Sequence, residues 1–230
     1  FPEASDAASL DATLDAVAAR SSIPARVIAT AFGAEFAQLG AHDLPLFAAP
    51  DASWFARRLD DETFGDFPAA ETSPAEVGPL AEARHPVAIE ARARWGASLP
   101  ARCLAAALDA AAIEALLRAA IARLEPHNAP ALSYAGAGTG CAVVSTARGP
   151  LAYRVSVAGG RVTDVRSAAP TEWNFHPQGP FARAIAQLGR MPDAERAVRF
   201  IAASFDPCVP VHVVWRSPAA AKSERATLHA

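Results

Sequence analysis

The stretch STARGPLAYRVSVAGGRVTDVRSAAPTEWNFHP, residues 145–177, decides the fold class of this 230-residue chain. Within it, residues 151–157 and 161–167 are rich in β-branched side chains and are separated by Ala158-Gly159-Gly160. Two such runs with a Gly-Gly connection predict an antiparallel β-hairpin. CAVVS, at 141–145, predicts another strand just before it, so a small sheet is expected over about 141–167.

On either side of this sheet, hydrophobic residues recur at helical spacing. The expected helices cover 6–20, 24–39, about 100–124, 181–188 and 193–203. The longest one carries a continuous apolar stripe, which predicts a central core helix. The members of the stripe are Leu104, Leu108, Leu117, Ile121 and Leu124. We therefore expect an α+β protein, mainly α with a small antiparallel sheet inserted late, as a single domain over 1–215 with a mobile tail over 216–230.

Two further segments predict irregular structure. Residues 44–80 are rich in Pro, Asp and Gly and are expected to be loop, apart from a short turn at 54–59. GAGTG, residues 136–140, lacks the spacing of a dinucleotide-binding fingerprint and precedes a strand instead of opening a helix. It predicts a turn into the sheet and not a phosphate-binding loop.

Composition excludes several classes of function. The net charge is −3 and the arginines are scattered, so we expect no binding to nucleic acid or to anionic lipid. No run of 18 apolar residues and no signal peptide are present, which argues against a membrane span. Three cysteines far apart in sequence argue against a disulfide framework, and we expect a reducing compartment, the cytoplasm.

No arrangement of residues typical of an enzyme is evident. The sequence has no G-x-S-x-G elbow and no H-E-x-x-H motif, and its six histidines lie far apart. Carboxylates are numerous, but no pair is singled out for acid–base chemistry. The interpretation is that the protein is not an enzyme.

Three segments, taken in order, resemble the large subunit of NiFe hydrogenases. They are AEVGPLA at 75–81, the Arg-Gly strand through PTEWN at 145–177, and SFDPCVPV at 204–211. The family holds nickel and iron with four thiolates, two from an early and two from a late Cys-x-x-Cys. Here Cys208 matches the first late cysteine, but Val211 and Val214 stand where the bridging cysteine and the closing histidine are expected. The resemblance therefore implies that no Ni–Fe centre is assembled on this chain.

This pattern of loss is similar to the HupK/HoxV-type hydrogenase accessory proteins. That resemblance implies a non-enzymatic scaffold that transiently holds the Fe(CN)2(CO) fragment. The fragment would come from the proteins of the hydrogenase maturation complex and pass to the hydrogenase large subunit. The alternative is a metal-free, degenerate paralogue of the large subunit that acts as a docking or chaperone-like partner.

The resemblance also implies roles for individual residues. Cys208 would supply one thiolate to iron, Cys141 is a second candidate ligand, and Arg148 would donate to a cyanide nitrogen. Thr171 and Asn174 belong to the same binding region, where they are expected to hold the loop in shape.

Each assignment has a structural alternative. Cys208 could be an inherited core thiol, since free cysteine is often buried. Arg148 could be paired with a nearby carboxylate at a strand end. The carrier hypothesis requires Arg148 and Cys208 to face a shared hollow.

Overall fold

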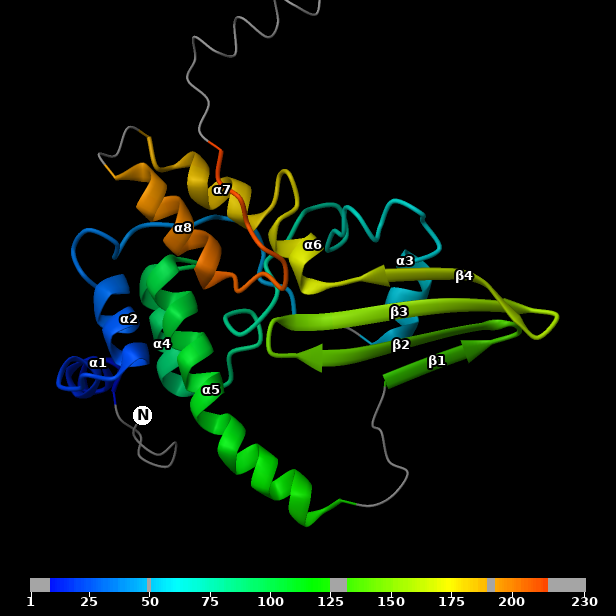
Figure 1. The fold of residues 1–230 in the computed structure, drawn as a ribbon, viewed down its shortest axis with the longest axis horizontal. Coiled ribbons are helices and arrows are strands. Elements are labelled where there is room, and N and C mark those ends of the chain that lie inside the picture. The colour runs from blue at the N-terminus through cyan, green and yellow to red at the C-terminus, as the bar shows by residue number, and fades with distance from the viewer. Residues whose placement is uncertain (1–8, 49–50, 125–131, 190–192, 215–230) are drawn as a thin grey trace, which may run out of the picture.

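A computed structural model describes residues 9–48, 51–124, 132–189 and 193–214 (Figure 1). A mainly helical body is followed by an antiparallel sheet late in the chain, so the expected α+β class is confirmed. The predicted tail over 216–230 lies outside the described residues. The helices are α1 (Leu10–Ala18), α2 (Ile23–Ala31), α3 (Ala52–Arg58), α4 (Pro86–Trp95), α5 (Leu99–Ala122), α6 (Pro170–Asn174), α7 (Pro180–Ala186) and α8 (Ala194–Ser204).

The sheet is a simple meander in the order β1-β2-β3-β4. Its strands are β1 (Leu132–Gly136), β2 (Thr139–Thr146), β3 (Gly149–Ala158) and β4 (Arg161–Ala168). The predicted hairpin is β3–β4, and the GAGTG segment is the turn between β1 and β2, where Gly138 adopts φ +71°. Strand β1 was not predicted, because its Gly-rich end was interpreted as turn alone.

One face of the sheet supports a core of large side chains. Helix α3 packs on β1, β2 and β3, and places Phe55 against the buried Cys141 and Val143 of β2. Trp173 of α6 is fully buried in the same cluster and stacks on Phe47 with ring centroids 5.1 Å apart. This cluster fixes α6 against the sheet.

The helical body is built around the first half of α5. Leu99 and Leu104 are fully buried, and α2, α4 and α8 all pack on this helix. Pro100 at the first turn suits a helix start, because proline lacks the N–H that would be unsatisfied there.

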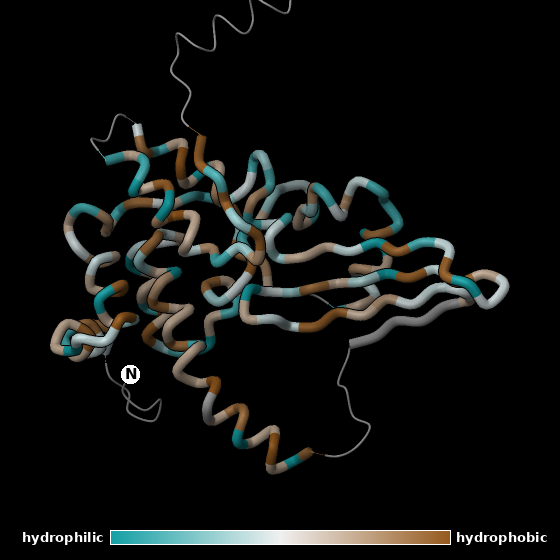
Figure 2. The backbone as a smooth tube through the Cα atoms, in the orientation of Figure 1, coloured by the Kyte–Doolittle hydropathy of each residue, from teal (hydrophilic) through white to brown (hydrophobic). Residues whose placement is uncertain are grey.

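The prediction of a core stripe along the whole of α5 is wrong for its second half. Leu117, Ile121 and Leu124 are 56%, 62% and 82% exposed. The physical reason is visible in Figure 1: the end of α5 projects beyond the body, and Figure 2 shows hydrophobic residues along the projecting part. Helical periodicity indicates an apolar face, but it does not say whether another element covers that face.

Other differences concern helix ends and short helices. The helix expected over 24–39 ends at Ala31, and turns lead from there to Gly40 at φ +67°. Residues 44–80 are largely irregular, as expected, with α3 where a turn was predicted. Helices α4 and α6 were not predicted. In the described part of the chain, no helix is long and apolar enough to cross a membrane.

Candidate functional site

Two of the recognised sequence motifs pack backbone against backbone. A Cβ atom added at Gly78 would lie 2.8 Å from the carbonyl oxygen of Arg148, and one at Gly149 would lie 3.0 Å from the Gly78 nitrogen. Both glycines have positive φ, at +112° and +123°. Glycine is the residue that permits such a conformation and such a close approach. The Val-Gly-Pro segment and the Arg-Gly turn are therefore joined directly.

Asn174 fastens a third motif to the first. Its side-chain oxygen accepts a hydrogen bond from the Val77 N–H, and its Nδ2 donates to the Val77 carbonyl, both at 3.1 Å. Asn174 is 3% exposed, so its amide groups are satisfied inside the protein by these two bonds. Asn174 thus ties helix α6 to the backbone of Val77.

Beneath this junction lies a buried ion pair between Arg102 and Glu76. Arg102 Nε and Nη2 donate to the two Glu76 carboxylate oxygens at 2.9 and 3.0 Å. The same guanidinium donates to the carbonyls of Gly40 and Ala97 at 2.9 and 2.8 Å, and its Cζ lies 4.0 Å from the Phe205 ring centroid. Side-chain exposure is only 3% for Arg102 and 2% for Glu76. A buried guanidinium requires a carboxylate partner and further hydrogen-bond acceptors of this kind.

Burial by itself would raise the pKa of Glu76, but the Arg102 charge and hydrogen bonds from Arg102 and His42 hold that pKa below its ordinary value. His42 Nε2 lies 2.5 Å from Glu76 Oε2, and the ring is completely buried. Its Nδ1 has no hydrogen-bond partner among the residues that the structure describes. Glu76 is thus an ionised anchor for Arg102.

Arg148 lies near the surface of the same region. Its Nε donates to the backbone carbonyl of Asp206 at 2.6 Å and forms an ion pair with Asp206 Oδ2 at 2.9 Å. The Arg148 side chain is 39% exposed and that of Asp206 is 67% exposed. Pairing with a carboxylate, the structural alternative for Arg148, is therefore present. Its terminal Nη1 and Nη2 have no hydrogen-bond acceptor in the described part of the chain.

Cys208 is exposed and lies two residues after Asp206. Its Sγ is 3.3 Å from Thr171 Oγ1. Thr171 belongs to α6, one helical turn before Asn174. Cys208 is therefore not a core thiol, and it contacts the α6 segment that carries the other matched residues.

A small cavity of about 50 Å³ lies between these groups. One water needs about 10–15 Å³ of such volume, so the cavity is large enough for a few small atoms and no more. Cys208 is not among its lining side chains, although Asp206 is. The polar and aromatic residues that line it include Glu76, Arg102, Arg148, Asn174, Phe205 and Asp206.

The remaining cysteines lie elsewhere. Cys141 is 3% exposed within the core cluster under the sheet, and does not line the cavity. Burial raises the pKa of its thiol, with Arg154 opposing that shift. Burial also raises the pKa of Cys103 to about 11. Among the described residues, no three His, Cys, Asp or Glu side chains are grouped so that they could hold a metal ion.

Arg102 and Asp206 were missed as members of this region. A signal for Arg102 exists, because it lies on the same helical face as Leu99 and Ala105, where an arginine needs a buried carboxylate. Glu76, in the recognised Glu-Val-Gly-Pro segment, was the available partner. The partner of Asp206 could not be deduced, since it depends on how residues 204–208 fold back over the Arg148 turn.

Comparisons with solved structures give a partial likeness of fold. NiFeSe hydrogenase from Desulfomicrobium baculatum is 19% identical, with a TM-score of 0.47 over 61% of this chain and 35% of that chain. An NAD+-reducing NiFe hydrogenase is 22% identical, with a TM-score of 0.40 over 58% of this chain and 34% of that chain. No protein-family model matches the chain.

Comparison with proteins of similar sequence identifies the family of this chain. The hydrogenase expression/formation protein HupK of Rhizobium leguminosarum bv. viciae is 32% identical over 186 residues, 76% of this chain and 47% of that protein. HupK of Azotobacter vinelandii is 31% identical over 70% of this chain and 52% of its own length. HoxV of Cupriavidus necator is 35% identical over 39% of this chain and 26% of its own length. The chain spans about half the length of the HupK relatives it matches. It belongs to the HupK/HupV/HoxV family of hydrogenase expression/formation proteins.

Proposed function

We propose that this protein is a non-enzymatic accessory protein of NiFe-hydrogenase maturation that transiently holds the Fe(CN)2(CO) fragment. The fragment is cargo, received from proteins of the maturation complex and delivered to the hydrogenase large subunit in the cytoplasm. Membership of a family of hydrogenase expression/formation proteins supports the general assignment. The observation that supports the finer one is that Arg148 and Asp206 line a small cavity, while Cys208, which does not line it, follows Asp206 by two residues and contacts Thr171.

The chemistry of these groups suits cyanide ligands. A cyanide bound to iron carries negative charge on its nitrogen, and a guanidinium is a strong, fixed donor to such an acceptor. Arg148 has Nε held by Asp206, which leaves its two terminal nitrogens as donors. The cavity of about 50 Å³ suits diatomic ligands, while the iron itself would remain near the surface.

A single thiolate favours release of the cargo. Cys208 is the one matched cysteine, and its exposure gives a metal access to the sulfur. Iron held by one thiolate and by hydrogen bonds to its ligands is bound less firmly than iron in a site with four thiolates. Cys141, buried with a raised thiol pKa, is the weaker candidate for a second ligand, because thiolate formation is opposed there.

Infrared spectroscopy of protein co-produced with the hydrogenase maturation proteins tests the proposal. We expect cyanide and carbonyl stretching bands on the purified protein, lost in Cys208→Ala and shifted or weakened in Arg148→Lys. Cys103→Ala is the matched control, since Cys103 lies on α5, away from Cys208 and Arg148. The cyanide and carbonyl bands should persist in this variant. Bands absent from well-folded wild-type protein would instead support the metal-free docking partner.

A further inference from the structure

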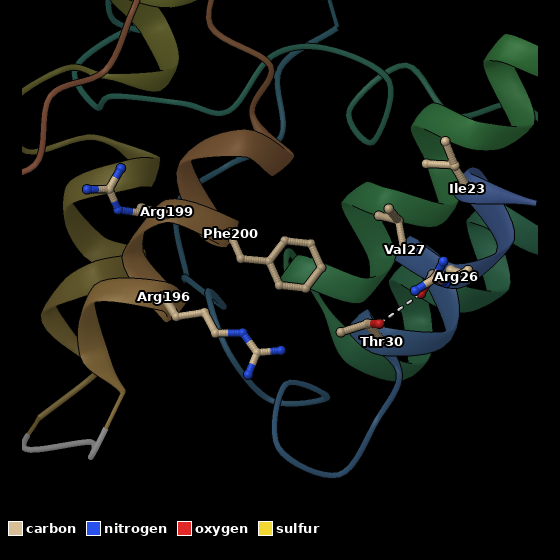
Figure 3. Close-up of a pocket in the computed structure, with 7 residues that line it drawn as sticks. All are labelled: Ile23, Arg26, Val27, Thr30, Arg196, Arg199 and Phe200. Atoms are coloured by element: carbon tan, nitrogen blue, oxygen red, sulfur yellow. Dashed lines mark hydrogen bonds between the residues drawn. The ribbon is translucent and has the colours of Figure 1, made fainter.

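A second concavity, unrelated to the cysteines, lies between α2 and α8. Both helices pack on α5, and the groove between them has a volume of about 620 Å³. Figure 3 shows Phe200 pointing from α8 toward Val27 and Thr30 of α2. The groove and the Arg148 cavity share no lining residue. Pockets of about 300–1,000 Å³ are typical of ligand sites, so the groove is large enough for a substantial ligand.

The groove has an apolar ridge on the α2 side. Ile23 and Val27 are one helical turn apart, so they lie on the same face of α2, and they are 77% and 41% exposed. On the opposite wall, Phe200 is half-buried and makes an edge-to-face contact with Phe36, with centroids 5.4 Å apart. Burial of these apolar side chains against a partner would stabilise the complex, because apolar surface is removed from water.

The charged side chains that line the groove are all positive. The seven lining residues include Arg26, Arg196 and Arg199 and no carboxylate, on a chain whose net charge is −3. Helix α2 itself contains no acidic residue. Arg199 pairs with Glu195 and Arg196 with Asp193, but all four side chains are more than half exposed. Exposed pairs of this kind are weak, so an incoming carboxylate can replace either partner.

We propose that the α2–α8 groove binds an acidic amphipathic helical segment of a partner protein. The apolar side of such a helix covers Ile23, Val27 and Phe200, and its flanking carboxylates pair with Arg26 and Arg196. A small inorganic anion would leave the apolar ridge uncovered. That the partner is a hydrogenase-assembly protein rests on the proposed function. That it is an acidic amphipathic helix rests only on the side chains of the groove.

The groove and the cavity are connected through one helix. Arg196 and Phe200 lie on α8, and the same helix ends at Ser204, directly before Phe205 and Asp206 of the cavity wall. A partner that is bound at the groove is therefore held on the element that positions Asp206 beside Arg148.

A defined peptide tests the proposal. The probe is a synthetic peptide of about four helical turns, with Leu at every third or fourth position and Glu on both flanks. Its twin carries Lys in place of every Glu. Isothermal titration with the full chain should detect the Glu peptide and not the Lys twin. The double variant Arg26→Glu/Arg196→Glu should weaken binding about tenfold or more, because two rim charges are reversed.

Arg94→Glu is the matched control, since Arg94 is 54% exposed and pairs with Asp11 on another face, much as Arg196 pairs with Asp193. It should leave the affinity unchanged. Equal binding of the two peptides, or equal affinity of wild-type and double variant, would overturn the proposal. So would dimerisation of the chain that the double variant abolishes, which would assign the groove to a second copy. The peptide titration is made on protein without the iron fragment, so its outcome does not depend on fragment binding and the two proposals fail separately.

Discussion

Two arginine–carboxylate pairs border the same cavity, and they differ in almost every physical respect. Arg102 and Glu76 are 3% and 2% exposed, and the guanidinium makes four hydrogen bonds, to one carboxylate and two backbone carbonyls. Arg148 and Asp206 are 39% and 67% exposed, and only the Nε of Arg148 has an acceptor in the described part of the chain. The first pair keeps four of the five Arg102 N–H groups inside the protein, whereas in the second both terminal nitrogens of Arg148 are available to a ligand.

This difference separates structure from function within one small region. A buried pair that loses one partner leaves an uncompensated charge, so Arg102 and Glu76 must be retained for the fold. An exposed pair contributes little stability, so the proposed binding role of Arg148 can be tested in a variant that still folds. Both pairs are held in place by the motifs that meet at Gly78 and Gly149.

The largest effect is expected from Arg102→Met. The substitution leaves Glu76 buried without its main partner, which should lower the free energy of unfolding by about 3–5 kcal/mol at neutral pH. Urea unfolding followed by circular dichroism measures this loss. Arg94→Met, which removes a pair that is more than half exposed, is the control and should have little effect. If Arg102→Met lost no more free energy of unfolding than Arg94→Met, the buried pair would not be required for the fold.

The pH dependence of that loss has a definite sign. In the wild type the pKa of Glu76 is held below its ordinary value, so the ion pair stabilises the fold above pH 4.5 and is lost as the pH falls through the folded-state pKa. Without Arg102, burial raises the pKa of Glu76, and the neutral acid is tolerated. The difference between wild type and Arg102→Met should therefore shrink from pH 7 toward pH 4. A difference that grows on acidification would contradict the assigned role of Arg102.

A somewhat smaller effect is expected from Gly78→Ala, which acts on the backbone junction that both pairs share. The new methyl group would lie 2.8 Å from the Arg148 carbonyl oxygen at a φ of +112°, and we expect a loss of about 3 kcal/mol. Gly189→Ala is the matched control, because Gly189 also has positive φ, +54°, but no atom lies within 4 Å. It should cost only about 1 kcal/mol. Equal losses would mean that the close approach is not a constraint.

The short sequence motifs predicted the residues around the Arg148 cavity better than hydrophobic periodicity did. Asn174, Arg148 and Cys208 were all singled out from the sequence, and the structure brings their segments together around the Val77–Gly78 loop. The reason is that backbone-packing glycines and a buried amide demand particular residues at particular places. Whether Cys208 and Arg148 bind iron stays a prediction.

Features that depend on distant contacts were harder to predict. The apolar stripe of α5 is the same in character at Leu104 and at Leu117, yet Leu104 is fully buried and Leu117 is 56% exposed. Nothing local distinguishes them, because burial is decided by where α2, α4 and α8 end against the helix. The sequence allowed a carboxylate partner for Arg148 but did not identify Asp206, since the two residues are 58 positions apart.

The smallest change in stability is expected from Arg148→Met, and it is the sharpest test of the comparison. The pair with Asp206 is exposed on both sides, so its removal should change the free energy of unfolding by less than about 1 kcal/mol. If the terminal nitrogens bind cyanide, the same variant should lose the infrared bands although it is fully folded. Urea unfolding and infrared spectroscopy on one preparation separate these effects. A variant as destabilised as Arg102→Met would show that Arg148, too, is required by the fold, and intact bands in a folded variant would remove Arg148 from the proposed site.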